Sequence, residues 1–157
     1  MIDYLSYLIF SLLFTAVHIF SYFLAGLINY QITKDFYGGK NALFTSFLRD
    51  TSKEEEIFRI NRLNIPAQII RGLLMSVVLY PILGIIGELS FAIRFVFFAG
   101  LMFVYADFAS AVPFSNTIEG LVYMKKPFVR REIFLKISFE AVVYSVLFGL
   151  LATWLLF

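Results

Sequence analysis

The sequence predicts an all-α integral membrane protein: a four-transmembrane-helix bundle with short amphipathic interfacial helices in its two cytoplasmic loops and both termini outside. Three observations support this fold class, namely an apolar composition, four long apolar runs and the placement of the basic residues. The 157 residues are 61% hydrophobic and 15% charged, with a mean hydropathy of +0.85, whereas soluble domains average about 45–50% apolar and about 25% charged residues. We expect a single membrane domain over residues 1–157.

The first predicted span covers residues 4–30. This stretch is nearly uncharged and exceeds the roughly 20 residues that a bilayer-spanning helix needs. Polar and small side chains recur along it at alternating spacings of four and three, which places them on one helical face: Ser11, Thr15, His18, Tyr22, Ala25 and Asn29. We expect that face to look into the bundle.

A polar loop follows over residues 31–64. Gly38 and Gly39 interrupt it, and four apolar residues after them have the spacing of a short helix at the membrane surface: Leu43, Phe44, Phe47 and Leu48. Thr51 and Ser52 each precede a glutamate by three residues, so either could form a capping box at a helix start.

The second predicted span covers residues 65–87, with Pro66 in its first turn and Arg71 as the one charge before its end. Gly72, Ser76 and Gly84 fall on one face at multiples of four residues. Small side chains at that spacing let a neighbouring helix backbone approach closely. We therefore predict that these three residues form a helix-packing surface.

The third span is predicted over residues 91–112 and the fourth over residues 132–157. In the loop between them, residues 113–131, Asn116 and Glu119 have the spacing of an N-cap and its partner, which predicts a short interfacial helix. In the fourth span Ser145 and Gly149 are four residues apart, and we expect them at a helix contact.

The basic residues predict the orientation. The loops 31–64 and 113–131 contain ten of the thirteen lysines and arginines, and basic loops stay on the cytoplasmic side of a membrane. The prediction is therefore a multi-pass protein of the cell membrane with its N- and C-termini on the non-cytoplasmic side.

Three charged residues form the first candidate site. At about 1.5 Å of rise per residue, Arg71, Asp107 and Glu140 each lie roughly one turn or two inside the cytoplasmic end of a span, so they could meet. Ionisable groups within a span cost about 2.5–3.5 kcal/mol on insertion scales, which makes them a functional-site hypothesis. The structural alternative is neutralisation, in which Arg71 reaches lipid phosphates and Lys136 pairs with Glu140.

His18 is the second candidate and the only histidine in the chain. A neutral imidazole near the middle of a span can relay protons, bind a metal or ligate haem, or it can form a hydrogen bond between helices. Because the chain has no cysteine and no second histidine, thiolate metal sites, disulfides and a bis-histidine haem within one copy are excluded. We predict no cofactor, no metal site and no catalytic set.

Three functional hypotheses follow. The first is a protein that acts through helix packing, as an accessory or assembly subunit of a membrane complex or as a homo-oligomer. The alternative is a small proton- or cation-coupled transporter or channel formed as an oligomer, in which Glu140, Asp107 and His18 handle the ion. The third is a membrane enzyme acting on lipid or quinone, disfavoured because no acid, base and nucleophile set is visible. The expected partners are membrane lipids and other membrane subunits or a second copy, with no support for nucleic acid.

Overall fold

Every regular element in the described part of the chain is a helix, which confirms the predicted all-helical class. The computed structural model describes residues 4–39 and 42–157. The described ranges contain three segments that could each cross a membrane alone, and a fourth that is bent. The bent one is α2 (Glu54–Val78) with the helical segment after it, which turns away by 41°; the two count as one candidate span if they cross the membrane together. Three other segments are long and apolar enough to cross by themselves: α1 (Tyr4–Tyr37), the continuous pair α4 (Phe91–Gly100) and η3 (Leu101–Phe108), and α6 (Arg131–Leu155).

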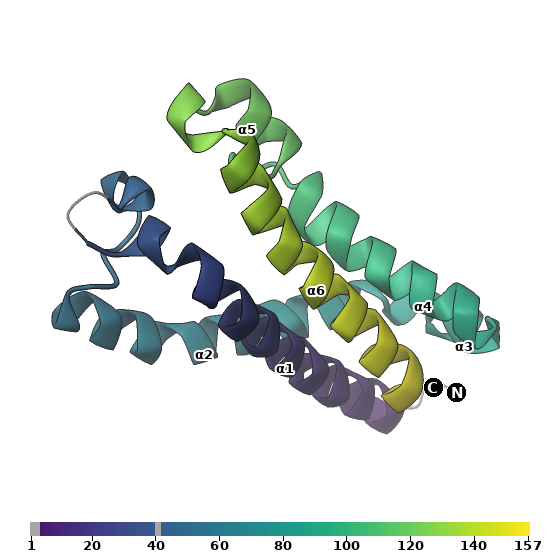
Figure 1. Ribbon diagram of the computed structural model, residues 1–157. Helices are drawn as coiled ribbons and strands as arrows, with labels where there is room; N and C mark the ends of the chain where they lie inside the picture. Colours follow the sequence, from purple (N-terminus) through teal and green to yellow (C-terminus); the bar gives the residue numbers. More distant parts are fainter. Residues whose placement is uncertain (1–3, 40–41) are drawn as a thin grey trace.

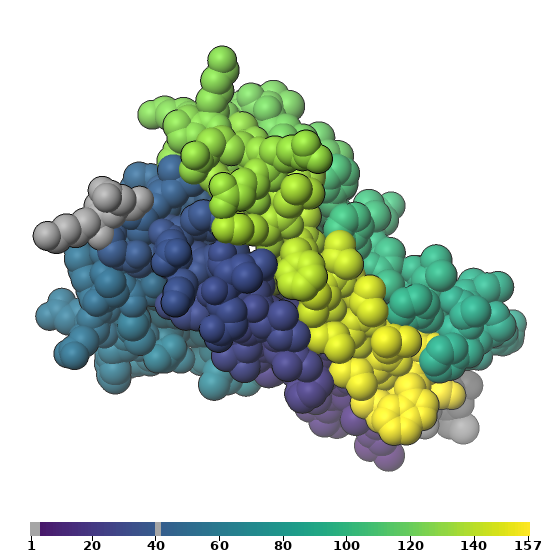
Figure 2. Space-filling model, in the orientation of Figure 1, coloured from purple at the N-terminus to yellow at the C-terminus, as the bar shows by residue number. Residues whose placement is uncertain are grey.

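The long helices pack in the order α2, α1, α6, α4 (Figure 1). The start of α1 and the end of α6 lie at one end of the molecule, where the rings of Phe10 and Phe157 are 6.2 Å apart; we call this the terminus end. The segments after α1 and after η3, which we call the first and second connectors, meet at the opposite, connector end (Figure 2). There the ring of Phe44 lies 5.4 Å from that of Phe114 and 6.4 Å from that of Phe128. The segment between α2 and α4 lies at the terminus end, where a Cβ at Gly87 would be 3.7 Å from the Phe157 ring.

An aromatic core fills the terminus end. Phe14 of α1, Phe98 of α4 and Phe148 of α6 are all fully buried. The rings of Phe14 and Phe148 are 4.9 Å apart, and those of Phe98 and Phe148 are 6.1 Å apart. Edge-on ring contacts of this kind hold three helices together through van der Waals packing.

The turn between α3 (Leu83–Glu88) and α4 is fastened by a single side chain. Arg94 donates hydrogen bonds to the carbonyl oxygens of Ile86, Gly87 and Leu89 at 3.2, 2.8 and 2.8 Å. The last carbonyls of a helix have no partner inside that helix. Arg94 therefore serves as the C-terminal cap of α3.

Two of the predicted packing glycines lie at close helix contacts. A Cβ atom added at Gly72 would be 3.0 Å from the Thr15 backbone of α1, and one added at Gly149 would be 2.9 Å from the Ala99 Cβ of α4. Ser76 bridges α2 and α1 by donating to the Ser11 hydroxyl at 2.7 Å.

The other two predicted packing residues differ from each other: Ser145 is buried, whereas Gly84 is not in a close contact. Ser145 is 2% exposed on α6. A Cβ at Gly84 would meet no atom of the described residues within 4 Å, so Gly84 is at no helix contact among them. The physical reason is the bend after α2: Pro81 has no N–H to continue the helix, and η2 (Tyr80–Ile82) starts a new direction.

The boundaries of the first two long helices differ from the predicted ones. α1 continues to Tyr37 and α2 begins at Glu54, so the helices enter the predicted loop 31–64 from both sides; residues 40–41 of that loop lie outside the described residues. Pro66 is inside α2 instead of in a first turn. It is exposed, so the one backbone hydrogen bond that it removes is lost on an outward face. Three glutamates in the first turn suit the positive end of the helix dipole.

Both predicted caps are wrong. The N-cap of α2 is Lys53, because Asp50 accepts hydrogen bonds from the backbone N–H and the hydroxyl of Ser52 at 2.9 and 2.6 Å. The N-cap of α5 (Ile118–Tyr123) is Thr117, whose hydroxyl accepts from the Gly120 N–H at 3.0 Å. Asn116, predicted as that cap, instead donates a hydrogen bond to Asp107.

The short apolar stretch in the first loop forms η1 (Leu43–Ser46), a single 3-10 turn. Its Phe44 is fully buried among aromatic rings of the two connectors, including Phe128 of η4 (Lys126–Phe128). Phe47 and Leu48 remain exposed. The aromatic cluster therefore joins the two connectors to each other.

Candidate functional site

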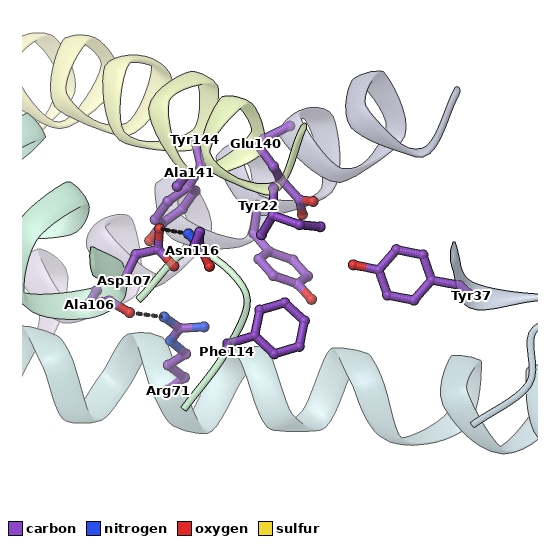
Figure 3. A pocket seen from close by; sticks show the side chains of 12 residues that line it. Tyr22, Tyr37, Arg71, Ala106, Asp107, Phe114, Asn116, Glu140, Ala141 and Tyr144 are labelled. Atoms are coloured by element: carbon purple, nitrogen blue, oxygen red, sulfur yellow. Dashed lines mark hydrogen bonds between the residues drawn. The ribbon is translucent and has the colours of Figure 1, made fainter. Parts of the chain in front are cut away.

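A polar cavity of about 180 Å³ lies toward the connector end, between α1, α2, η3 and α6 (Figure 3). Its walls combine three charged side chains, three tyrosines and one asparagine with small and apolar residues. The lining residues are Tyr22, Ala25, Tyr37, Arg71, Ala106, Asp107, Phe114, Asn116, Ile137, Glu140, Ala141 and Tyr144. A space of that size holds several water molecules.

The three charged candidates, Arg71, Asp107 and Glu140, all line this cavity from different helices. No ion pair within 4.0 Å joins any two of them; the ion pairs among the described residues connect Arg49 with Glu56 and Lys136 with Glu132. Lys136, the predicted structural partner of Glu140, is thus 2.8 Å from Glu132 instead. The cavity brings the charges together without pairing them.

Glu140 is held by one neutral donor. The side-chain amide of Asn29, on α1, donates to the Glu140 Oε2 atom at 2.7 Å. Asn29 is fully buried and lies about three turns beyond His18 on the same face of α1. The opposite oxygen, Oε1, packs 3.7 Å from where a Cβ would lie at Gly26. An amide donor supports the carboxylate without neutralising its charge.

Asp107 has the same arrangement on the other side of the cavity. Asn116 donates its side-chain N–H to the Asp107 Oδ2 atom at 2.7 Å. Asp107 is part of the π-helix η3, where the Ala109 N–H bonds to the Val104 carbonyl five residues earlier at 2.8 Å. A π-helical turn of this kind is often found at functional sites. Asn116 is 1% exposed, and its own Oδ1 atom has no hydrogen-bond partner among the described residues.

Arg71 is nearly free of partners. Within the described ranges its hydrogen bond is a long one, from Nη2 to the Ala106 carbonyl oxygen at 3.4 Å. A guanidinium group carries five N–H donors. Most of the donor capacity of Arg71 is therefore available at the cavity wall, as its position in Figure 3 shows.

His18 lies outside the cavity but is connected to it. The imidazole is fully buried, with Nε2 3.0 Å from Gln68 Oε1 and Nδ1 2.7 Å from the Tyr144 hydroxyl. Because a carbonyl oxygen only accepts, Nε2 bears the hydrogen and Nδ1 accepts from Tyr144. Tyr144 lines the cavity. No group of three or more histidine and acidic side chains in the described ranges is arranged to hold a metal ion.

A larger groove of about 820 Å³ adjoins the cavity. It is bordered by α1, α2 and residues 47–51, and it shares Tyr22, Tyr37 and Glu140 with the cavity. The Arg49–Glu56 ion pair, at 2.7 Å, lies on its wall. Glu140 is thus the acid that faces both spaces.

Several site residues were missed from the sequence. Tyr37 lies beyond the predicted end of the first span, and Asn116 was assigned to a helix cap. Asn29 was placed on the inward face, but nothing in the sequence pairs it with an acid 111 residues away. A buried asparagine within a span is itself a weak signal, because an amide in a membrane needs a polar partner.

Comparisons of this chain with protein-family models, with curated proteins and with solved structures find no match. The geometry of the cavity is therefore the basis for the functional conclusions that follow.

Proposed function

We propose that this chain is a small multi-pass membrane transporter in which Glu140 and Asp107 handle a proton or a small cation. In this proposal four helical spans form the bundle, with α2 and its bent continuation as one span. The short helices of the connectors lie at the cytoplasmic surface of the cell membrane, and both termini are outside.

The position of the connectors supports this topology. Ten of the thirteen lysines and arginines lie in the two connectors and in the helix ends that adjoin them, and aromatic side chains of the connectors pack together through Phe44 and Phe128. The terminus end lies at the opposite end of the long helices. Two basic connectors at one end and both termini at the other are what an even number of spans requires, and basic segments favour the cytoplasmic side.

The proposed function rests on one observation: two acids, Glu140 and Asp107, line the same polar cavity, and neither forms an ion pair with Arg71. Both acids are half-buried. Withdrawing a carboxylate from water without a cationic partner costs free energy, so a purely structural pair would be expected to contact Arg71. Instead Glu140 and Asp107 each accept a single amide hydrogen bond. Each can therefore take up a proton or cation and release it.

Access to the site is one-sided, which favours a transporter over an open channel. The groove that reaches Glu140 is bordered by residues of the first connector. Toward the terminus end, Phe14, Phe98 and Phe148 fill the space between the helices and are fully buried. A transporter alternates the access to its site between the two sides of the membrane, and this arrangement corresponds to access from the side of the connectors.

Ion flux in liposomes tests this proposal. Glu140→Gln should abolish proton or sodium uptake driven by an imposed potential, because the amide keeps the shape of the side chain but cannot carry the charge. Glu132→Gln is the matched control: it lies on the same helix, 63% exposed beside Lys136, and should leave uptake unchanged. Equal uptake by the native chain and both variants, with unchanged thermal stability, would reject the proposal.

Association through helix packing is the second candidate function. An apolar groove of about 320 Å³ lies on the α4–α6 face, bordered by Phe95, Ala99, Gly100, Phe103 and Ser145 among others. A Cβ at Gly100, like one at Gly84, would meet no atom within 4 Å. Small residues on an outer face suit a contact with a second copy or another membrane subunit. A strictly monomeric chain with no co-purifying protein in mild detergent would count against it.

A further inference from the structure

We infer that the cavity binds a small zwitterion, a solute that carries both a carboxylate and an ammonium group, as an amino acid does. This inference rests on the proposed transport function and adds the class of solute. It follows from the charges that the cavity presents, from their hydrogen bonds and from the size of the space.

The carboxylate of the solute is matched by Arg71. Its guanidinium lines the cavity and, among the described residues, donates only the long bond to Ala106. Neither Asp107 nor Glu140 is within ion-pair distance of it. A planar guanidinium binds a carboxylate through two parallel N–H bonds, so the free donors of Arg71 form the anion-binding part of the site.

The ammonium group is matched by Glu140 and the aromatic wall. Glu140 accepts one hydrogen bond, from Asn29, and its carboxylate has capacity for more. Tyr22 and Tyr37 also line the space, and Figure 3 shows their hydroxyl groups directed toward each other beside Glu140. Aromatic rings attract a cation through their negative faces. The Oδ1 atom of Asn116 is buried at the cavity and has no hydrogen-bond partner in the described part of the chain, so it is a further acceptor.

The charge balance separates a zwitterion from simpler solutes. One guanidinium and two carboxylates leave the cavity with one excess negative charge. A lone anion would double that excess, and a lone cation would leave the Arg71 donors without a charged partner. A zwitterion fills both parts of the site, and a proton or monovalent cation at Asp107 then removes the excess. We therefore expect one ion to move with each solute molecule.

The size of the space limits the solute. A cavity of about 180 Å³ is below the roughly 300–1,000 Å³ of drug-sized binding pockets. It is suited to a solute with few heavy atoms, such as glycine or alanine.

Binding to the purified full chain in lipid nanodiscs tests this inference. The probes are L-alanine, L-alaninamide, which lacks the carboxylate, and propionate, which lacks the ammonium group. We expect L-alanine to bind, measured by calorimetry and by the shift in Tm, and each of the other two to bind at least about tenfold more weakly, because each loses one charged contact. Arg71→Gln should remove the preference for L-alanine over L-alaninamide. Arg59→Gln, an exposed position on the same helix, should retain it.

The outcomes distinguish this inference from the proposed function. Equal binding of L-alanine and L-alaninamide would overturn the zwitterion, as would the absence of all binding in a chain that shows Glu140-dependent ion flux; the transport proposal would stand in both cases. Absence of both binding and flux would overturn both. If Arg71→Gln does not fold, the three probes on the native chain still decide, and Arg71→Lys, which keeps the charge, should show a weakened preference for L-alanine.

Discussion

The two ends of this molecule are built from the same helices but in opposite ways. At the terminus end, α1, α4 and α6 meet through fully buried phenylalanines, with Phe148 between Phe14 and Phe98. Toward the connector end, the same α1 and α6 separate around a cavity with charged walls. The terminus end, which we also call the filled end, holds the helices together by packing. The connector end contains charged side chains that packing alone would not require.

This difference predicts where substitutions act. Substitutions of side chains at the filled end should therefore have the larger effect on the free energy of unfolding. The half-buried acids of the cavity should contribute little stability, because withdrawing a charge from water costs free energy that a single amide hydrogen bond only partly returns. Ionisable side chains placed within a span at such a cost are candidates for a functional site.

The largest expected effect is at the centre of the filled end. Phe148→Ala should lower the free energy of unfolding by about 3–5 kcal/mol, the range for a large aromatic side chain removed from a packed core. Phe139→Ala is the matched control on α6, because Phe139 is 45% exposed. Thermal unfolding in detergent measures both, and equal losses would show that the aromatic core does not hold the helices.

A smaller effect is expected where two helices approach most closely. Gly149→Leu should destabilise the protein by about 1–3 kcal/mol, as overpacking does, since even its Cβ would be 2.9 Å from that of Ala99. Gly100→Leu, on the helix opposite, introduces the same side chain where no atom lies within 4 Å. Unfolding in detergent should separate the two variants. A Gly149→Leu protein as stable as the native one would place the α4–α6 contact elsewhere.

The smallest effect concerns an acid that lies outside both the cavity and the aromatic core. Three hydrogen-bond donors, led by the Ser52 hydroxyl, stabilise the charged form of Asp50 in the first connector and lower its pKa below the ordinary value of 3.8. A lowered folded-state pKa gives stability that is present above the unfolded pKa and is lost as pH falls through the folded one. Asp50→Asn should therefore flatten the decline in Tm below about pH 4. An unchanged acid profile would mean that the Asp50 turn is not coupled to folding.

The sequence predicted that the three charged side chains would lie close together, but not which residues would form hydrogen bonds with the two acids. Arg71, Asp107 and Glu140 could be placed together because a charge within an apolar run is conspicuous and helix rise gives its depth. Asn29 and Asn116 could not, because a neutral amide serves equally as a cap or as a donor to a distant acid, and the pairing depends on how α1 and η3 are oriented.

The helix boundaries show a second limit. The polar residues after residue 30 predict a loop, yet α1 continues to Tyr37. The end of an apolar run predicts where a span ends but not where its helix ends, because a helix can continue through polar residues. Gly84 fitted a four-residue stripe with Gly72, but the bend at η2 turns it away from α1. Spacing predicts a shared face only while the helix stays straight.

The measurement that most directly tests the contrast between the ends is cysteine accessibility in membrane vesicles of known orientation. The chain has no cysteine, so each substitution introduces a single thiol. Ala141 lines the cavity and Ala152 lies in the filled core, both on α6; Lys126→Cys in the second connector marks the side on which the connectors lie. We predict that a small water-soluble thiol reagent labels Ala141→Cys from the same side as Lys126→Cys, and that Ala152→Cys is labelled from neither side. Equal labelling of Ala141→Cys and Ala152→Cys, or labelling of neither, would contradict a polar cavity reached from the connector side.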